Sequence, residues 1–214
     1  MKLALNHMAV PRLGALAFLD AAKALGCVGV EFRNDLARPL FDGLAPEAIR
    51  EAAASRGLRI LALAEVKMFN AWSDTKRDEA SALMDVAVRC GAEAVSLIPR
   101  NDNQGMGNGE RQANLRLALR ELKPMLEAHG LTGLVEPLGF EICALRYKEE
   151  AVEAIEALGA KGCFKLVHDT FHHHLAHGGP IYAEHTGIVH VSGVVDQTLA
   201  VSEMRDGHRV LVDG

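Results

Sequence analysis

The order of secondary structure along the chain constrains its fold more than any other feature of the sequence. Short apolar runs typical of buried strands occupy residues 3–5, 28–32, 58–64, 94–98, 131–135, 164–167 and 188–191. Amphipathic helical patterns separate most of these runs, at residues 13–25, 46–55, 74–89, 110–129 and 147–158. Alternation of strand and helix from end to end predicts an α/β protein with a parallel sheet.

Glycines mark the joints between the predicted helices and strands. They recur every 29 to 39 residues, at Gly26, Gly57, Gly91, Gly130 and Gly159, as expected of residues that end helices in the left-handed conformation. Polar residues end nearly every strand and no glycine-rich phosphate-binding fingerprint occurs, so a (β/α) barrel is favoured over a doubly wound sheet. Because a complete barrel uses eight strands in about 250 residues, we expect a single domain over residues 1–214. It would be a (β/α)8 TIM barrel truncated at its C-terminus, with strand eight missing.

Charge and hydropathy argue against several classes of partner and location. The chain has 214 residues, a formal net charge of −5 and no segment rich in lysine and arginine, which argues against a nucleic-acid partner. No apolar run approaches the roughly 20 residues of a membrane span, and the N-terminus has no secretory signal pattern. The four cysteines are scattered, as in proteins with reduced thiols. We therefore expect a cytoplasmic protein that binds neither membrane nor nucleic acid.

Three successive predicted strands end in residues that can bind a metal ion. Glu136, Asp169 and His190 stand at the carboxyl ends of the last three strands, where parallel barrels carry their active sites. Two carboxylates and an imidazole suit Mn²⁺, Mg²⁺, Co²⁺ or Zn²⁺, with coordination positions left for water or substrate. Taken singly, Glu136 could form a buried ion pair, Asp169 could cap a helix and His190 could be a core histidine. Taken together, they predict a divalent-metal site.

Other polar residues at the strand ends predict contacts with a small polyhydroxylated substrate. His172 follows Asp169 by three residues and could face the same pocket. Glu31 and Arg33 alternate along one strand and so share a face, with a structural ion pair as the alternative. Lys67 could instead extend along the rim of the sheet. The predicted substrate-binding residues are Asn6, Glu31, Arg33, Lys67, His172 and His174.

These strand ends resemble those of the xylose-isomerase-like TIM-barrel superfamily of sugar isomerases and epimerases, most closely its inosose isomerases. The matching segments are residues 3–6, 30–33, 61–63, 69–70, 134–136, 167–172 and 189–191. The resemblance implies a cation held by Glu136, Asp169, His190 and a second glutamate, which would lie on the missing strand eight. It also implies proton transfer next to a carbonyl through an enediolate, with Glu136 as one catalytic group, and a role in inositol catabolism.

Two other functions stay open at this point. The chain could be a non-catalytic sugar- or metal-binding relic of the same fold, an interpretation that the missing strand favours. It could also resemble the abasic-site endonucleases of the superfamily, which are metal-dependent phosphodiesterases, although the acidic balance disfavours a protein that grips DNA phosphates. An open barrel also exposes strand edges, so a homodimer is a further expectation.

Overall fold

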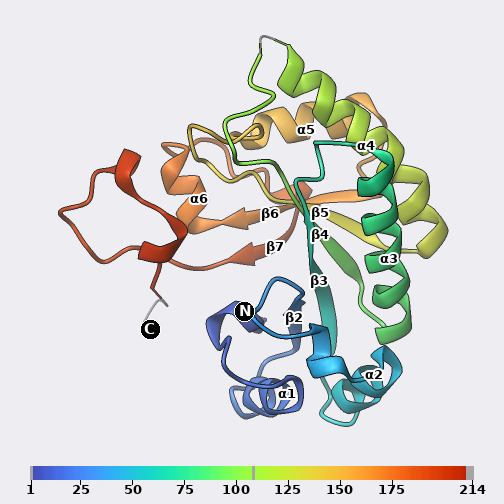
Figure 1. Ribbon diagram of the computed structural model, residues 1–214. Helices are drawn as coiled ribbons and strands as arrows, with labels where there is room; N and C mark the ends of the chain where they lie inside the picture. The colour runs from blue at the N-terminus through green and yellow to red at the C-terminus, as the bar shows by residue number, and fades with distance from the viewer. Residues whose placement is uncertain (1, 108, 211–214) are drawn as a thin grey trace.

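The computed structural model describes residues 2–107 and 109–210 and contains one parallel sheet in these residues. The strands pair in chain order, each with the next, so that β1 and β7 are the two edges. The sheet is curled as in a (β/α)8 barrel, and seven strands are present in the described residues (Figure 1), which confirms the predicted fold class. The strands are β1 (Ala4–Asn6), β2 (Gly29–Arg33), β3 (Arg59–Lys67), β4 (Ala94–Ile98), β5 (Thr132–Val135), β6 (Phe164–Asp169) and β7 (Thr186–His190).

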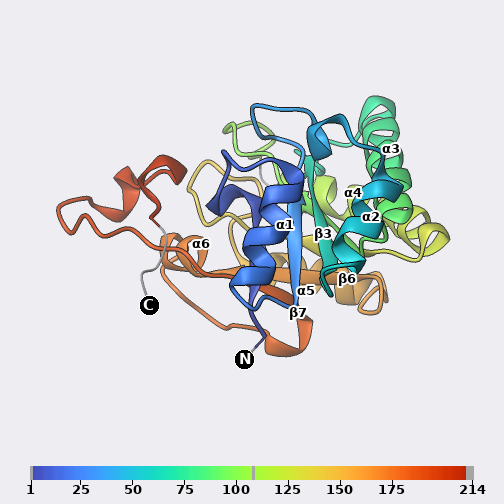
Figure 2. The same cartoon turned by 90° about the horizontal axis from the view of Figure 1, so that it is seen from below.

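Helices cover the outer face of the curled sheet (Figures 1 and 2). The long helices are those that the sequence pattern predicts. The five glycines predicted to end them, Gly26, Gly57, Gly91, Gly130 and Gly159, all have positive φ angles, and Gly91 and Gly130 are the C-caps of α3 and α4. The α-helices are α1 (Ala15–Ala24), α2 (Pro46–Ala54), α3 (Asp74–Cys90), α4 (Glu110–His129), α5 (Lys148–Ala157) and α6 (Thr170–Leu175). No helix in the described part of the chain is both long enough and apolar enough to cross a membrane.

Most of the predicted boundaries lie one or two residues from the observed ones, and those of β3 and β7 differ for an identifiable reason. Strand β3 runs on to Lys67 rather than ending at residue 64, through an irregular register between Ala64 and Val66. Strand β7 begins at Thr186, which pairs with Leu166 of β6, whereas the apolar pattern places its start at residue 188. In both cases polar or small residues continue the backbone pairing of the strand. A prediction based on apolar runs does not include such residues.

The core has an outer and an inner layer. The outer layer packs large side chains such as Phe18, Phe32 and Phe164 between the sheet and its helices. The inner layer, inside the curl, is small and holds Ala62, Ala94, Leu134 and Val167. Because side chains alternate along a strand, Val167 on the inner face is followed two residues later by Asp169 on that face. The inner layer therefore supports a polar site at the carboxyl ends of the strands.

The segment after β7 projects from the sheet and then returns to it (Figure 1). Two short 3-10 helices, η4 (Val201–Glu203) and η5 (Asp206–His208), lie on this segment. Met204 joins a small apolar cluster with Phe140, Phe171 and Leu175. An isolated antiparallel bridge between Gly193 and Val210 then brings the chain back beside the end of β7.

Candidate metal centre

The structure brings the three predicted metal ligands together at the ends of adjacent strands. Glu136 directly follows β5 and extends its pairing with β4, because its backbone N–H donates to Leu97 O at 3.2 Å. Asp169 and His190 end β6 and β7 and face each other in register. The Nδ1 atom of His190 lies 3.6 Å from Glu136 Oε1 and 4.0 Å from Asp169 Oδ2.

A second imidazole, that of His172, lies at the same point. It stands in the first turn of α6, and its Nε2 is 3.9 Å from Glu136 Oε1. One ligand atom from each of Glu136, Asp169 and His172 lies within 4.8 Å of the others, and all three residues are buried. The tightest group of ligand atoms thus contains His172, predicted as a substrate-binding residue, in place of the predicted ligand His190. His190 lies beside this group and contacts both of its carboxylates at 3.6 and 4.0 Å.

The spacing of these atoms fits a metal ion better than it fits direct hydrogen bonds. Contacts of 3.6 to 4.0 Å are longer than hydrogen bonds to nitrogen, which measure about 2.7–3.2 Å. Two ligand atoms bonded at about 2.1 Å to one ion lie about 3 to 4 Å apart. Glu136 is only 5% exposed, and its nearest basic partners, His190 and His172, lie 3.6 and 3.9 Å from its Oε1. These residues therefore fit a divalent cation of the kinds predicted.

Glu31 orients the imidazole of His190. The Nε2 atom of His190 donates to Glu31 Oε2 at 2.7 Å, which leaves Nδ1 facing Glu136. Asn6 Nδ2 donates to the same oxygen at 2.7 Å, and Ser96 Oγ donates to Oε1 at 3.0 Å. A carboxylate that holds the far nitrogen of an imidazole is the usual partner of a metal-binding histidine. The sequence alone does not reveal this role, since Glu31 and His190 are 159 residues apart.

The electrostatics of the site follow from this arrangement. Burial disfavours the charged form of Glu136, but His190, His172 and Arg209 outweigh it and lower its pKa to about 2. Burial likewise disfavours the charged form of His190, yet Glu31 and Glu136 raise its pKa well above the usual value. For His172 burial prevails and lowers the pKa, despite the neighbouring carboxylates. Without a cation, an imidazolium at His190 therefore joins two buried carboxylates.

Asp169 combines two of the roles that the sequence leaves open. Its Oδ1 caps α6 by accepting from the backbone N–H groups of Phe171, at 2.7 Å, and His172, at 3.2 Å. Its Oδ2 accepts from Nη2 of Arg209 at 2.5 Å. Sequence reasoning missed Arg209, and the signal that could have found it is the charged group of residues 205–209 after the last strand.

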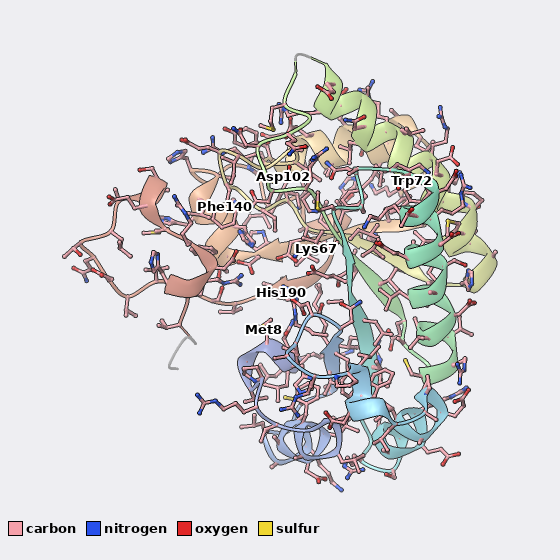
Figure 3. The ribbon with its side chains drawn as sticks, viewed as in Figure 1. Met8, Lys67, Trp72, Asp102, Phe140 and His190 are labelled. Carbon is pink, nitrogen blue, oxygen red and sulfur yellow. The ribbon has the colours of Figure 1, made fainter. Side chains whose placement is uncertain are left out.

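The other predicted substrate-binding residues divide into two groups. Asn6 and Glu31 already bond to protein partners, and Arg33 donates to Asp35 and Glu65 rather than pairing with Glu31. Lys67 and His174 are exposed. Figure 3 labels Lys67 and His190 near the middle of the view, between Met8 and Phe140. Contact of any of these residues with a substrate stays a prediction.

Comparisons with known proteins show the family and the fold. The family model described as "Xylose isomerase-like TIM barrel" matches residues 19–214. A xylose isomerase domain-containing protein from Salmonella typhimurium LT2 is 30% identical with a TM-score of 0.90, over 98% of this chain and 77% of that one. The IolI protein, solved with a binding zinc atom, is 20% identical with a TM-score of 0.87, over 98% of this chain and 78% of that one. D-Psicose 3-epimerase is 14% identical with a TM-score of 0.70, over 89% and 73%. A search of curated proteins gave no match.

Proposed function

This chain belongs to the xylose isomerase-like TIM-barrel family, and from that premise we propose that it is a divalent-metal-dependent isomerase or epimerase of a small polyhydroxylated ketone. The observation that carries the proposal is the group formed by Glu136, Asp169 and His172, whose ligand atoms lie within 4.8 Å of one another. The Nδ1 atom of His190 lies 3.6 and 4.0 Å from the two carboxylates of this group. The zinc of the IolI structure and the activity named for D-psicose 3-epimerase support it as properties of structural neighbours. The sequence resemblance favours inosose as the substrate and therefore a role in inositol catabolism.

A bound divalent cation would supply polarisation of the carbonyl and neighbouring hydroxyl oxygens of the substrate. Glu136, Asp169, His172 and His190 would hold it, and Glu31 fixes which nitrogen of His190 is presented. Polarisation of this kind acidifies the proton on the adjacent carbon, so its transfer between neighbouring carbons is the reaction that such a site favours.

In the cation-free protein, His190, His172 and Arg209 lower the pKa of Glu136 to about 2 against the effect of burial. Glu136 is therefore a carboxylate there, which is the form that a cation ligand or a proton acceptor needs. A catalytic role for Glu136 stays a prediction. Its test requires metal content and turnover to be measured together in the same variant.

Deuterium exchange tests the proposed function directly. The protein, loaded with Mn²⁺ or Zn²⁺, is incubated with inosose, psicose or tagatose in D₂O, and NMR follows deuterium at the carbon next to the carbonyl. We expect exchange in the wild type and a loss of about 100-fold or more in Glu136→Gln, the scale of a removed acid–base or charge-stabilising group. Glu141→Gln, at an exposed position in the same loop, is the matched control.

The possible outcomes separate an enzyme from a binding protein. Exchange in the wild type and in Glu141→Gln, with loss in Glu136→Gln, supports an isomerase. If the protein binds a sugar but catalyses no deuterium exchange with either Mn²⁺ or Zn²⁺, the chain belongs to the non-catalytic alternative. Full exchange and full metal content in Glu136→Gln would remove Glu136 from the site.

A further inference from the structure

We propose that Arg209 is an internal counter-ion that competes with a divalent cation for Asp169. This competition lowers the affinity of the candidate centre for the cation. The proposal rests on the metal-dependent function proposed above. It concerns how tightly the site binds a cation, whereas the proposed function concerns what a bound cation is used for.

The first argument is that Arg209 occupies the one oxygen that Asp169 has left. Oδ1 already accepts two backbone N–H groups at the start of α6, at 2.7 and 3.2 Å. Oδ2 accepts Nη2 of Arg209 at 2.5 Å. This oxygen is also the one that lies 4.0 Å from His190 Nδ1, on the side of the candidate centre. A cation bound by Asp169 at this oxygen would therefore have to replace the guanidinium or share the oxygen with it.

The second argument is that several contacts of the fold hold this guanidinium in place, so that it does not merely reach in from the surface. The antiparallel bridge between Gly193 and Val210 positions the neighbouring Arg209 beside the end of β7. Its Nε and Nη2 donate to Ser192 Oγ at 3.0 and 2.7 Å, and its Nη1 donates to Asp206 Oδ1 at 3.2 Å. The guanidinium carbon also lies 5.0 Å from the centre of the Phe171 ring.

The third argument is electrostatic. Among the described residues, Arg209 is the only lysine or arginine within 4.0 Å of a carboxylate of the centre. Asp169 is buried, and a buried carboxylate needs a charged or hydrogen-bonding partner. Arg209 supplies that partner while no cation is bound, and its positive charge then repels an arriving cation. The same contact thus stabilises the cation-free protein and weakens cation binding.

The contacts of Arg209 with Ser192, Phe171 and Asp206 do not involve Asp169. They can hold the guanidinium at the edge of the centre after Asp169 is released. We therefore expect displacement of one hydrogen bond, without unfolding of the segment that carries Arg209.

Isothermal titration of EDTA-stripped protein with Mn²⁺ and with Zn²⁺ tests the proposal without any substrate. Arg209→Met keeps the length of the side chain and removes its charge and donors. We expect it to bind the cation about tenfold more tightly, the factor that corresponds to one charge-assisted hydrogen bond, and Arg209→Lys to bind with intermediate affinity. Arg205→Met is the matched control, because Arg205 lies on the same segment and its guanidinium, among the described residues, donates to the backbone carbonyls of Ser202 and Met204 alone.

Side-chain NMR gives a second readout on the unsubstituted protein. The Nη2 proton of Arg209 that Asp169 accepts should exchange slowly with water in the stripped protein and faster as Zn²⁺ is added, whereas the protons bonded to Ser192 and Asp206 keep their protection. Retained protection of the proton bonded to Asp169 at saturating Zn²⁺ would overturn the proposal. It is also overturned if folded Arg209→Met and Arg209→Lys bind no more tightly than wild type, and that result leaves the metal-dependent function intact. If neither wild type nor Arg209→Met binds a cation, both proposals fall.

Discussion

At the scale of single residues, His190 is the group on which the centre depends most. It donates through Nε2 to Glu31 at 2.7 Å and presents Nδ1 to Glu136 at 3.6 Å. Burial opposes a charge on this imidazole, but the two carboxylates raise its pKa well above the usual value. His190 is therefore an imidazolium at neutral pH in the cation-free protein. A cation at Nδ1 has to displace a proton.

Cation binding should accordingly release about one proton at pH 7 and tighten as the pH rises. The sign follows from the raised pKa: below it His190 holds a proton at Nδ1, and at higher pH less of this proton remains to be displaced. Titration calorimetry in buffers of different ionisation enthalpy measures the number released. Glu31→Gln, which removes one of the carboxylates that raise the pKa of His190, should reduce the number. Binding with no proton uptake or release in wild type would contradict an imidazolium at His190.

The sequence predicts much of the centre at this scale but not the partners of its ligands. Glu136, Asp169 and His190 were predictable because the carboxyl ends of parallel strands meet at one edge of a sheet. The hydrogen bond between His190 and Glu31 was not predictable from the sequence, because it joins the distant strands β7 and β2. Arg209 was not predictable either, because its position depends on the single bridge between Gly193 and Val210 rather than on any periodic pattern.

At the scale of elements, the short helix α6 sets the orientation of His172. Its six residues are too few for a helical period to be recognised in the sequence. The side chain of Asp169 caps its N-terminus. The loop after β5 lies directly against it. At Gly139, an added Cβ would lie 2.1 Å from the backbone oxygen of His172 and 3.0 Å from Leu175 Cβ, and φ is +73°.

Gly139→Ala should therefore destabilise the protein and displace α6. The clash is with backbone, which cannot rotate away, and the positive φ adds strain for alanine, so we expect a loss of about 2 kcal/mol or more in the free energy of unfolding. Urea denaturation measures it, and cation affinity should fall in parallel because His172 moves. Gly162→Ala is the control, since an added Cβ there meets nothing within 4 Å. Equal stability of the two variants would show that the loop and α6 are not in this contact.

At the scale of the whole molecule, the centre connects parts of the barrel that are far apart in the chain. Its residues come from the ends of β5, β6 and β7, from α6 and, through Arg209, from the returning segment. No short stretch of sequence contains the full set, so the unfolded chain offers a cation at most Asp169 and the three histidines at 172–174. A cation that binds the folded state more tightly than the unfolded chain stabilises the fold.

Divalent cations should therefore raise the unfolding temperature, and EDTA should reverse the effect. At a free cation concentration of about 100 times Kd, the expected stabilisation is about 2.7 kcal/mol, which thermal unfolding followed by circular dichroism detects readily. Asp169→Asn is the informative variant, because an asparagine oxygen can still cap α6 while the negative charge is lost. It should fold, show little cation-dependent stabilisation and leave Arg209 without its carboxylate partner. A shift as large in Asp169→Asn as in wild type would mean that the cation binds elsewhere, and the convergence of strand ends would then have to be explained by the ion pairs alone.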